Sequence, residues 1–291
     1  MDTTSAVRCE GLHKRYGPHQ ALRGLDLDVP TGSLFGFLGP NGAGKSTTLR
    51  ILSGLVRANS GSATIFGSPV SRHVDATARA AFLIENAVFP PHLTAAQVLR
   101  RSAAYSGVSI DLDVLDRVGM EHARNRRTRG YSHGMKQRLG LACTLQGKPD
   151  LLVLDEPQNG LDPDGLRTIR GILREEHERG ATVLVSVHRL AEVEGLCTHA
   201  ALVVQGKVVR QGSIDELLGG DKPQYRLRCD DPAGAAELIG AIVTEGELQF
   251  DANEAQAAEA AAKCHAAGIK LFELTPVRRS LDEMYRTEVS S

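Results

Sequence analysis

The chain has 291 residues, of which 42% are hydrophobic and 24% are charged, and its formal net charge at pH 7 is −1. This length and composition suit a globular protein with about two domains, or with one large domain and an appendage. The near-neutral charge argues against nucleic acid as a partner, because proteins that bind a polyanion carry a clear basic excess.

Two further features of composition bear on where the chain works. The five cysteines are dispersed without a CxxC pair, which favours reduced thiols over a disulfide framework or a zinc site. No apolar stretch approaches the ~20 residues of a membrane helix, and the first residues lack the core of a signal peptide. We therefore expect a cytoplasmic chain that cannot form a transmembrane path by itself.

Extended segments are expected at residues 7–16 and 22–29, where the second shows the alternation of a half-buried strand. The short apolar run SLFGFLG follows and ends in a glycine-rich turn, after which STTLRILSGL has helical spacing. A strand, a glycine-rich loop and a helix in this order open a nucleotide-binding α/β unit.

The glycine-rich turn fits the pattern GxxxxGK[ST]. Its glycines let successive backbone N–H groups point at phosphate oxygens, and the helix N-terminus adds a favourable dipole. We expect Lys45 to reach the β- and γ-phosphates and to act in catalysis, and the Ser46 hydroxyl to bind Mg²⁺. The predicted nucleotide-binding residues of this loop are Gly39, Pro40, Asn41, Gly42, Ala43, Gly44, Lys45, Ser46 and Thr47.

From about residue 90 to residue 147 the pattern is mostly helical. Beyond it, LLVLD and TVLVSV are continuous apolar runs, as expected of strands buried on both faces of a parallel sheet. The first run ends in Asp155, which we expect to bind Mg²⁺ through a water molecule. The adjacent Glu156 is predicted to be catalytic, polarising the water that attacks the γ-phosphate.

A linker composition at residues 219–223 predicts a boundary between a domain of residues 1–220 and a second domain of residues 221–291. Strand-like and helix-like segments alternate after the linker, which predicts a small α+β domain. Its alanine-rich run AAEAAAKCHAA has high helix propensity and flanking charges, so we interpret it as an ordered helix.

Two further motifs narrow the family. YSHGMKQRL, at residues 131–139, resembles the signature of ABC ATPases, usually written LSGGQ, and residues 159–163 resemble the D-loop of that family. With the phosphate loop and the acidic strand in the same order, the resemblance extends over about residues 7–218. It implies an ATP-hydrolysing subunit of an ABC transporter that powers a separately encoded transmembrane permease.

The resemblance also implies roles for single residues. Tyr16 matches the aromatic residue that stacks on adenine, and His188 matches the catalytic switch histidine that contacts the γ-phosphate. Taken alone, either residue would more often be a packing or surface residue. Ser132 and Gly134 are expected to close over the ATP of a second subunit, which implies a dimer, most simply a homodimer.

Two departures from the family pattern stand out. In the signature, His133 and Met135 replace a glycine and a glutamine. Glu85 stands where the family has the glutamine of the Q-loop, as in the exporters of bacitracin-resistance and lantibiotic-immunity systems. The resemblance implies that Glu85 binds Mg²⁺ together with Ser46 and Asp155. At a position beside Mg²⁺, a carboxylate brings a full negative charge where the amide is neutral.

We therefore expect an α/β P-loop NTPase core of ABC type with an inserted helical subdomain, followed by the small α+β domain. ATP and Mg²⁺ are the expected cofactors, drugs or antimicrobial peptides the cargo, and the inner face of the cell membrane the location, through the permease. A soluble ABC ATPase acting on DNA or ribosomes is the alternative, although such relatives carry a long coiled coil, zinc cysteines or tandem cassettes. A P-loop kinase or GTPase would lack YSHGMKQRL.

Overall fold

The computed structural model describes residues 5–71, 78–85, 87–187, 193, 195–218, 224–244 and 247–277. The chain divides between Gly212 and Ser213 into two compact units, each described here by itself. The boundary predicted from composition, at residues 219–223, lies outside the described residues. In the described part of the chain, no helix is long and apolar enough to cross a membrane.

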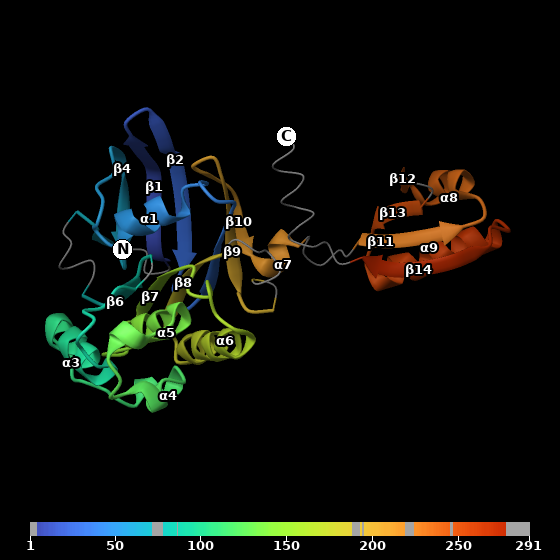
Figure 1. The fold of residues 1–291 in the computed structure, drawn as a ribbon. Coiled ribbons are helices and arrows are strands. Elements are labelled where there is room, and N and C mark those ends of the chain that lie inside the picture. The colour runs from blue at the N-terminus through green and yellow to red at the C-terminus, as the bar shows by residue number, and fades with distance from the viewer. Residues whose placement is uncertain are drawn as a thin grey trace. The chain divides into compact units, whose positions relative to one another are not determined.

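The first unit is built on a six-stranded sheet (Figure 1). Its strands are β3 (Leu34–Leu38), β6 (Ala80–Leu83), β7 (Leu151–Asp155), β8 (Thr182–Val187), β9 (His199–Val204) and β10 (Lys207–Ser213). Their order is β10-β9-β3-β8-β7-β6, and β9, β3, β8, β7 and β6 pair in parallel. Strands β3, β7 and β8 are buried along their whole length, so the expectation of strands covered on both faces is confirmed.

The same unit contains an antiparallel sheet of order β2-β1-β4-β5. It consists of β1 (Ser5–Tyr16), β2 (His19–Pro30), β4 (Ser60–Ile65) and β5 (Ser68–Pro69). Its buried residue Leu22 shares one apolar core with Phe37 of β3 and with Leu49 of helix α1 (Lys45–Leu52). Helix α1 therefore packs against both sheets, which fixes the direction in which the preceding loop points.

Among the described residues of the first unit, the other α-helices are α3 (Ala95–Ser106), α4 (Val114–Arg117), α5 (His133–Thr144) and α6 (Pro163–Glu178). Helices α3, α4 and α5 gather at one end of the unit and fall within the expected helical stretch (Figure 1). A capping box of Thr94 and Gln97 starts α3, and Gly107 ends it with a φ of 67°. The hydroxyl oxygen of Ser132 accepts the backbone N–H of Met135 at 3.2 Å and so caps α5.

In its described residues, the second unit begins with α7 (Ile214–Leu217), which is followed by a four-stranded sheet and two further helices. In chain order these are β11 (Gln224–Cys229), α8 (Pro232–Ile239), β12 (Ile242–Thr244), β13 (Glu247–Asp251), α9 (Glu254–Ala266) and β14 (Leu271–Val277). The strands pair antiparallel in the order β12-β13-β11-β14, which is the split βαβ arrangement of ferredoxin-like domains. The alanine-rich run is helix α9, as expected.

All five cysteines are free thiols. Burial raises the pKa of the Cys9 and Cys197 thiols to about 12, and it raises that of Cys143 to about 11. Because the thiolate is the reactive form, burial favours the less reactive thiol form of these three cysteines.

Candidate active site

The phosphate loop connects the end of β3 to the start of α1. A β-carbon at Gly39 would lie 2.4 Å from the carbonyl oxygen of Val203, and one at Gly44 would lie 2.7 Å from Leu22 Cδ2. Gly44 also has a φ of 108°, a conformation that residues with side chains rarely adopt. Glycine at these positions therefore lets the loop run close to β9 and β2 and turn its N–H groups toward an anion at the start of α1.

Lys45 is held inside this loop. Its Nζ donates hydrogen bonds to the carbonyl oxygens of Gly39, at 2.6 Å, and Pro40, at 3.2 Å, and the residue is only 5% exposed. Burial lowers the pKa of Lys45, although the carboxylates of Glu156 and Asp155 act in the opposite direction. The ammonium group thus donates to the loop carbonyls and is also attracted by two acidic residues.

A pocket of about 250 Å³ opens over the phosphate loop, and we call it the nucleotide pocket. Tyr16, at the end of β1 and 40% exposed, lines it together with His19 and Glu156. The remaining lining residues are Ala21, Pro40, Asn41, Gly42, Ala43, Gly44, Lys45, Ser46 and Thr47. The structure therefore places the Tyr16 ring beside the phosphate loop, and its stacking on adenine stays a prediction.

A second pocket, of about 280 Å³, adjoins the first, because Ser46 and Glu156 line both. We call it the polar pocket; it is lined by Ser46, Arg50, Glu85, Gln137, Asp155, Glu156 and Asn159. These residues come from α1, from the segment after β6, from α5 and from the end of β7. Ser46, Glu85 and Asp155, which were assigned to the metal from sequence, therefore lie in one pocket.

Ser186 of β8 fixes the two acidic residues at the end of β7. Its hydroxyl donates to Asp155 Oδ1 at 2.5 Å, and the same oxygen accepts the backbone N–H of Glu156 at 3.0 Å. The Glu156 side chain in turn accepts a hydrogen bond from Asn159 Nδ2. Glu156 also has a φ of 46°, so its backbone is held in a strained conformation beside both pockets.

The oxygen donors of the polar pocket suit Mg²⁺. This ion prefers hard oxygen ligands, and proteins bind it through one or two side chains together with nucleotide phosphates and water. The Ser46 hydroxyl and the Asp155 carboxylate are donors of this kind. No group of three or more His, Cys, Asp or Glu side chains forms a metal site in the described part of the chain. The pocket therefore fits a metal that binds together with ATP.

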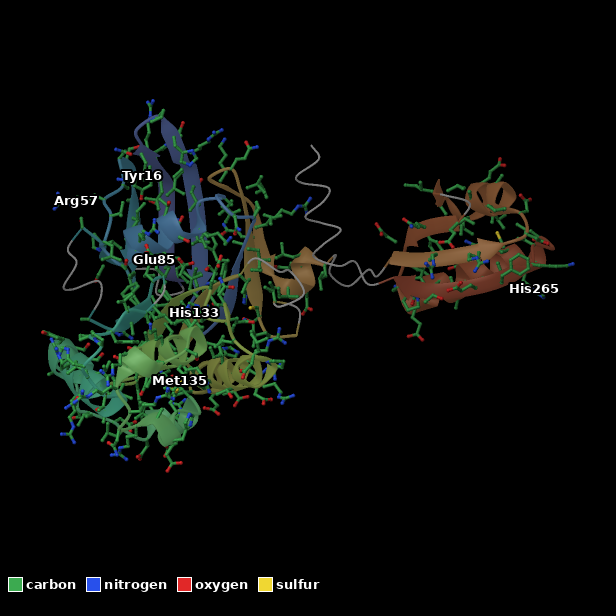
Figure 2. The ribbon with its side chains drawn as sticks, viewed as in Figure 1. Tyr16, Arg57, Glu85, His133, Met135 and His265 are labelled. Atoms are coloured by element: carbon green, nitrogen blue, oxygen red, sulfur yellow. The ribbon has the colours of Figure 1, made fainter. Side chains whose placement is uncertain are left out.

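Ser132 and Gly134, the signature residues expected to face a phosphate, lie apart from both pockets, whereas Gln137 of the same motif lines the polar pocket. Ser132 and Gly134 are at the start of α5, and a β-carbon at Gly134 would lie 3.2 Å from Leu161 Cδ2. His133 lies against Gly160, where a β-carbon would be only 2.3 Å from the imidazole Cδ2. Within one chain, the start of the signature thus contacts the D-loop and does not line the nucleotide pocket. Figure 2 shows His133 and Met135 well apart from Tyr16.

His188 lies outside the described residues, so its predicted contact with the γ-phosphate stays a prediction. Sequence reasoning missed the positioning contacts of Ser186, Asn159 and Arg50 with the acidic residues. Only Asn159 carried a signal, because it belongs to the stretch that resembles the D-loop.

The fold and the two pockets define a P-loop nucleotide-binding protein. A family model described as ABC transporter matches residues 22–159. The chain is 35% identical over 242 residues to the bacitracin transport ATP-binding protein BcrA of Bacillus licheniformis, covering 81% of this chain and 79% of that one. It is 37% identical to the daunorubicin/doxorubicin resistance ATP-binding protein DrrA of Streptomyces peucetius, covering 80% and 73%.

The lantibiotic transport ATP-binding protein SrtF of Streptococcus pyogenes is 36% identical, over 72% of this chain and 91% of its own. Among solved structures, an ATP-binding subunit of an ABC transporter superposes with a TM-score of 0.68 at 27% identity, covering 73% of this chain and 92% of that one. The chain therefore belongs to the ABC transporter family, as an ATP-binding subunit with the ATP-hydrolase domain of that family.

Proposed function

We propose that this chain hydrolyses ATP to power export of a drug or an antimicrobial peptide through a separately encoded transmembrane permease. The observation that carries the proposal is the meeting of Ser46, Asp155 and Glu156 in one polar pocket beside the phosphate loop. The direction and the cargo are inferred from BcrA, DrrA and SrtF, whose names describe bacitracin transport, drug resistance and lantibiotic transport. Because ATP is a cytoplasmic substrate, the chain would work on the inner face of the membrane.

Different residues of the two pockets would serve different steps of ATP binding and hydrolysis. The loop N–H groups and Lys45 would hold the phosphates, and Tyr16 would stack on the base. Glu156, oriented by Asn159 and Ser186, would polarise the attacking water. Mg²⁺, when bound with ATP, would be held by Ser46 and Asp155 and would neutralise charge that develops on the phosphates.

A second copy of the chain would complete each site. Ser132 is exposed and its hydroxyl oxygen already accepts the Met135 N–H, which leaves its own O–H free to donate to an anion. The start of α5 adds N–H groups and a favourable dipole. Since these donors lie outside the nucleotide pocket of their own chain, we infer that they face the γ-phosphate bound by a partner copy, in a head-to-tail homodimer.

The permease would dock in an apolar groove of about 790 Å³ beside the polar pocket. The exposed residues Leu55, Val88 and Tyr105 line this groove, which we call the docking groove. Ile84 lines it too, whereas its neighbour Glu85 lines the polar pocket. The segment of Ile84 and Glu85 therefore lines both the docking groove and the polar pocket. Through it, a change at the nucleotide could alter the surface that meets the permease.

Co-purification with a multi-span membrane protein encoded beside this chain would test the proposal. We expect the double variant Val88→Ser with Tyr105→Ser to lose co-purification from detergent-solubilised membranes. The double variant should still bind ATP. Val209→Ser is a matched control, because Val209 is also an exposed apolar residue of the first unit but lies on β10. Retention of the permease by the double variant would contradict this docking site, and absence of any membrane partner would favour a soluble ABC ATPase.

A further inference from the structure

Arg50 and Glu85 form an ion pair in the polar pocket. Arg50 Nε donates to Glu85 Oε1 at 2.6 Å, and Arg50 Nη2 lies 2.5 Å from the same oxygen. Arg50 belongs to the last turn of α1, the helix that begins with Lys45, and Glu85 follows β6. The pair therefore joins the helix of the phosphate loop to the segment that also lines the docking groove.

The Arg50–Glu85 ion pair is expected to contribute little to folding stability. The side chains of Arg50 and Glu85 are 33% and 57% exposed, and ion pairs with this exposure contribute little to the free energy of unfolding. Glu85 also has a φ of 64°, a left-handed conformation that is costly for a residue with a side chain. The main effect of the ion pair is therefore to offset the charge of the Glu85 carboxylate and to hold that carboxylate in position.

The charges around the polar pocket explain why Glu85 needs a positively charged partner. The carboxylates of Glu85, Asp155 and Glu156 line it, and Arg50 is the one cationic residue among those that line it in the described part of the chain. Through Ser46 the pocket adjoins the phosphate loop, so these carboxylates lie next to the region of the terminal phosphate. A third carboxylate without a counter-charge would repel that phosphate.

We propose that Arg50 is a positioning residue that neutralises Glu85 and holds its carboxylate against α1, so that the pocket accepts the γ-phosphate of ATP in spite of the acidic residue. Arg50 acts through Glu85 and has no direct role toward the nucleotide. Loss of Arg50 therefore penalises a nucleotide with a γ-phosphate more than one without it. The inference rests on the proposed nucleotide site, and it requires neither the permease nor export.

Nucleotide affinity of the isolated full chain tests this directly. We compare a non-hydrolysable ATP analogue with ADP by isothermal titration calorimetry at one Mg²⁺ concentration. Arg50→Met should weaken binding of the analogue about three- to tenfold, as expected for one unscreened charge near a phosphate, and binding of ADP less than about twofold. Arg50→Lys keeps the positive charge and should retain most of the affinity.

The double variant separates positioning from direct contact. In the Glu85→Gln background, Arg50→Met should no longer weaken binding of the analogue, because no charge is left to neutralise. Arg57→Met is the matched control, since Arg57 is exposed, has no carboxylate partner among the described residues and lies away from Glu85 (Figure 2). Arg50→Gln repeats the cycle if thermal unfolding shows that Arg50→Met destabilises the chain.

Three outcomes would overturn the proposal. Equal losses with and without Glu85→Gln would mean that Arg50 contacts the nucleotide or supports the fold by itself. Equal losses for the analogue and for ADP would point to general damage, and no loss at all would leave Arg50 without a role. If the wild-type chain bound neither nucleotide, the nucleotide site itself would be contradicted, so the two failures are distinguishable.

Discussion

Ser186 holds Asp155 and Glu156 in place with a single hydroxyl group, donating to the carboxylate of the first at 2.5 Å and accepting the backbone N–H of the second at 3.0 Å. Ser186 is fully buried, so bulk water does not compete for these bonds. The relationship links the proposed metal ligand and the proposed catalytic residue to one position on the neighbouring strand.

We predict that Ser186→Ala lowers the rate of ATP hydrolysis about tenfold, because both acidic residues lose a fixed orientation, and lowers the free energy of unfolding by about 1–3 kcal/mol. Steady-state hydrolysis and urea denaturation measure the two effects. Ser33→Ala is the control, since Ser33 is also buried and donates to the carbonyl oxygen of Pro30 at 2.6 Å, away from both pockets. A slower rate in both variants would show that the effect is general.

Tyr16 should contribute to affinity through its ring and not through its hydroxyl. Tyr16→Ala is expected to weaken ATP binding by about 1–3 kcal/mol, the range of base–aromatic stacking, whereas Tyr16→Phe should be nearly silent. Calorimetry with ATP distinguishes the two. Equal losses for both substitutions would assign the role to the hydroxyl and refute stacking.

Lys45 should strengthen nucleotide binding while lowering the free energy of unfolding of the chain. Burial lowers its pKa more than the carboxylates of Glu156 and Asp155 raise it. Between the lowered folded-state pKa and the ordinary value, the unfolded chain binds more protons, so stability rises with pH across that window and the penalty is fully present below it.

We therefore predict that Lys45→Met raises the free energy of unfolding at neutral pH, while it weakens ATP binding at least about tenfold. Urea denaturation at neutral and alkaline pH measures the first effect, which should shrink as the pH rises. A less stable Lys45→Met chain would show that attraction to the carboxylates outweighs burial.

Glu85 should matter more for coupling than for binding, because its segment reaches both the polar pocket and the docking groove. Glu85→Gln is expected to leave ATP affinity within about tenfold, roughly 1.4 kcal/mol. In the reconstituted complex, cargo-stimulated hydrolysis and resistance to the exported compound should fall together. Unchanged transport with strongly impaired basal hydrolysis of the free subunit would instead place Glu85 in the chemistry.

The parts of the site that sequence could predict are local ones. Lys45 and Ser46 lie within one continuous motif whose spacing implies a loop around phosphate, and Asp155 ends an apolar run that reads as a buried strand. Ser186 is 31 residues away from Asp155, and only the pairing of β7 with β8 sets them opposite each other. Such a contact has no signature in the sequence.

The same limit applies to the Arg50–Glu85 pair and to the second unit. Arg50 is 35 residues from Glu85, and no local pattern in the sequence pairs the two residues. In the second unit, alternating segments predicted an α+β domain, but the order β12-β13-β11-β14 depends on which strands find each other in space. Propensity and periodicity are properties of segments, whereas pairing order is a property of the whole unit.

The most direct test of ATP hydrolysis between two copies of this chain is the mass of Glu156→Gln in solution, measured by size-exclusion chromatography with light scattering. Glu156→Gln removes the group that polarises water but keeps the donors that bind phosphate, so ATP with Mg²⁺ should trap a closed dimer. ADP should leave it monomeric, and adding Ser132→Ala should weaken the dimer. A Glu156→Gln chain that stays monomeric with ATP and hydrolyses it at the normal rate would contradict the assignment of Glu156 and the shared site.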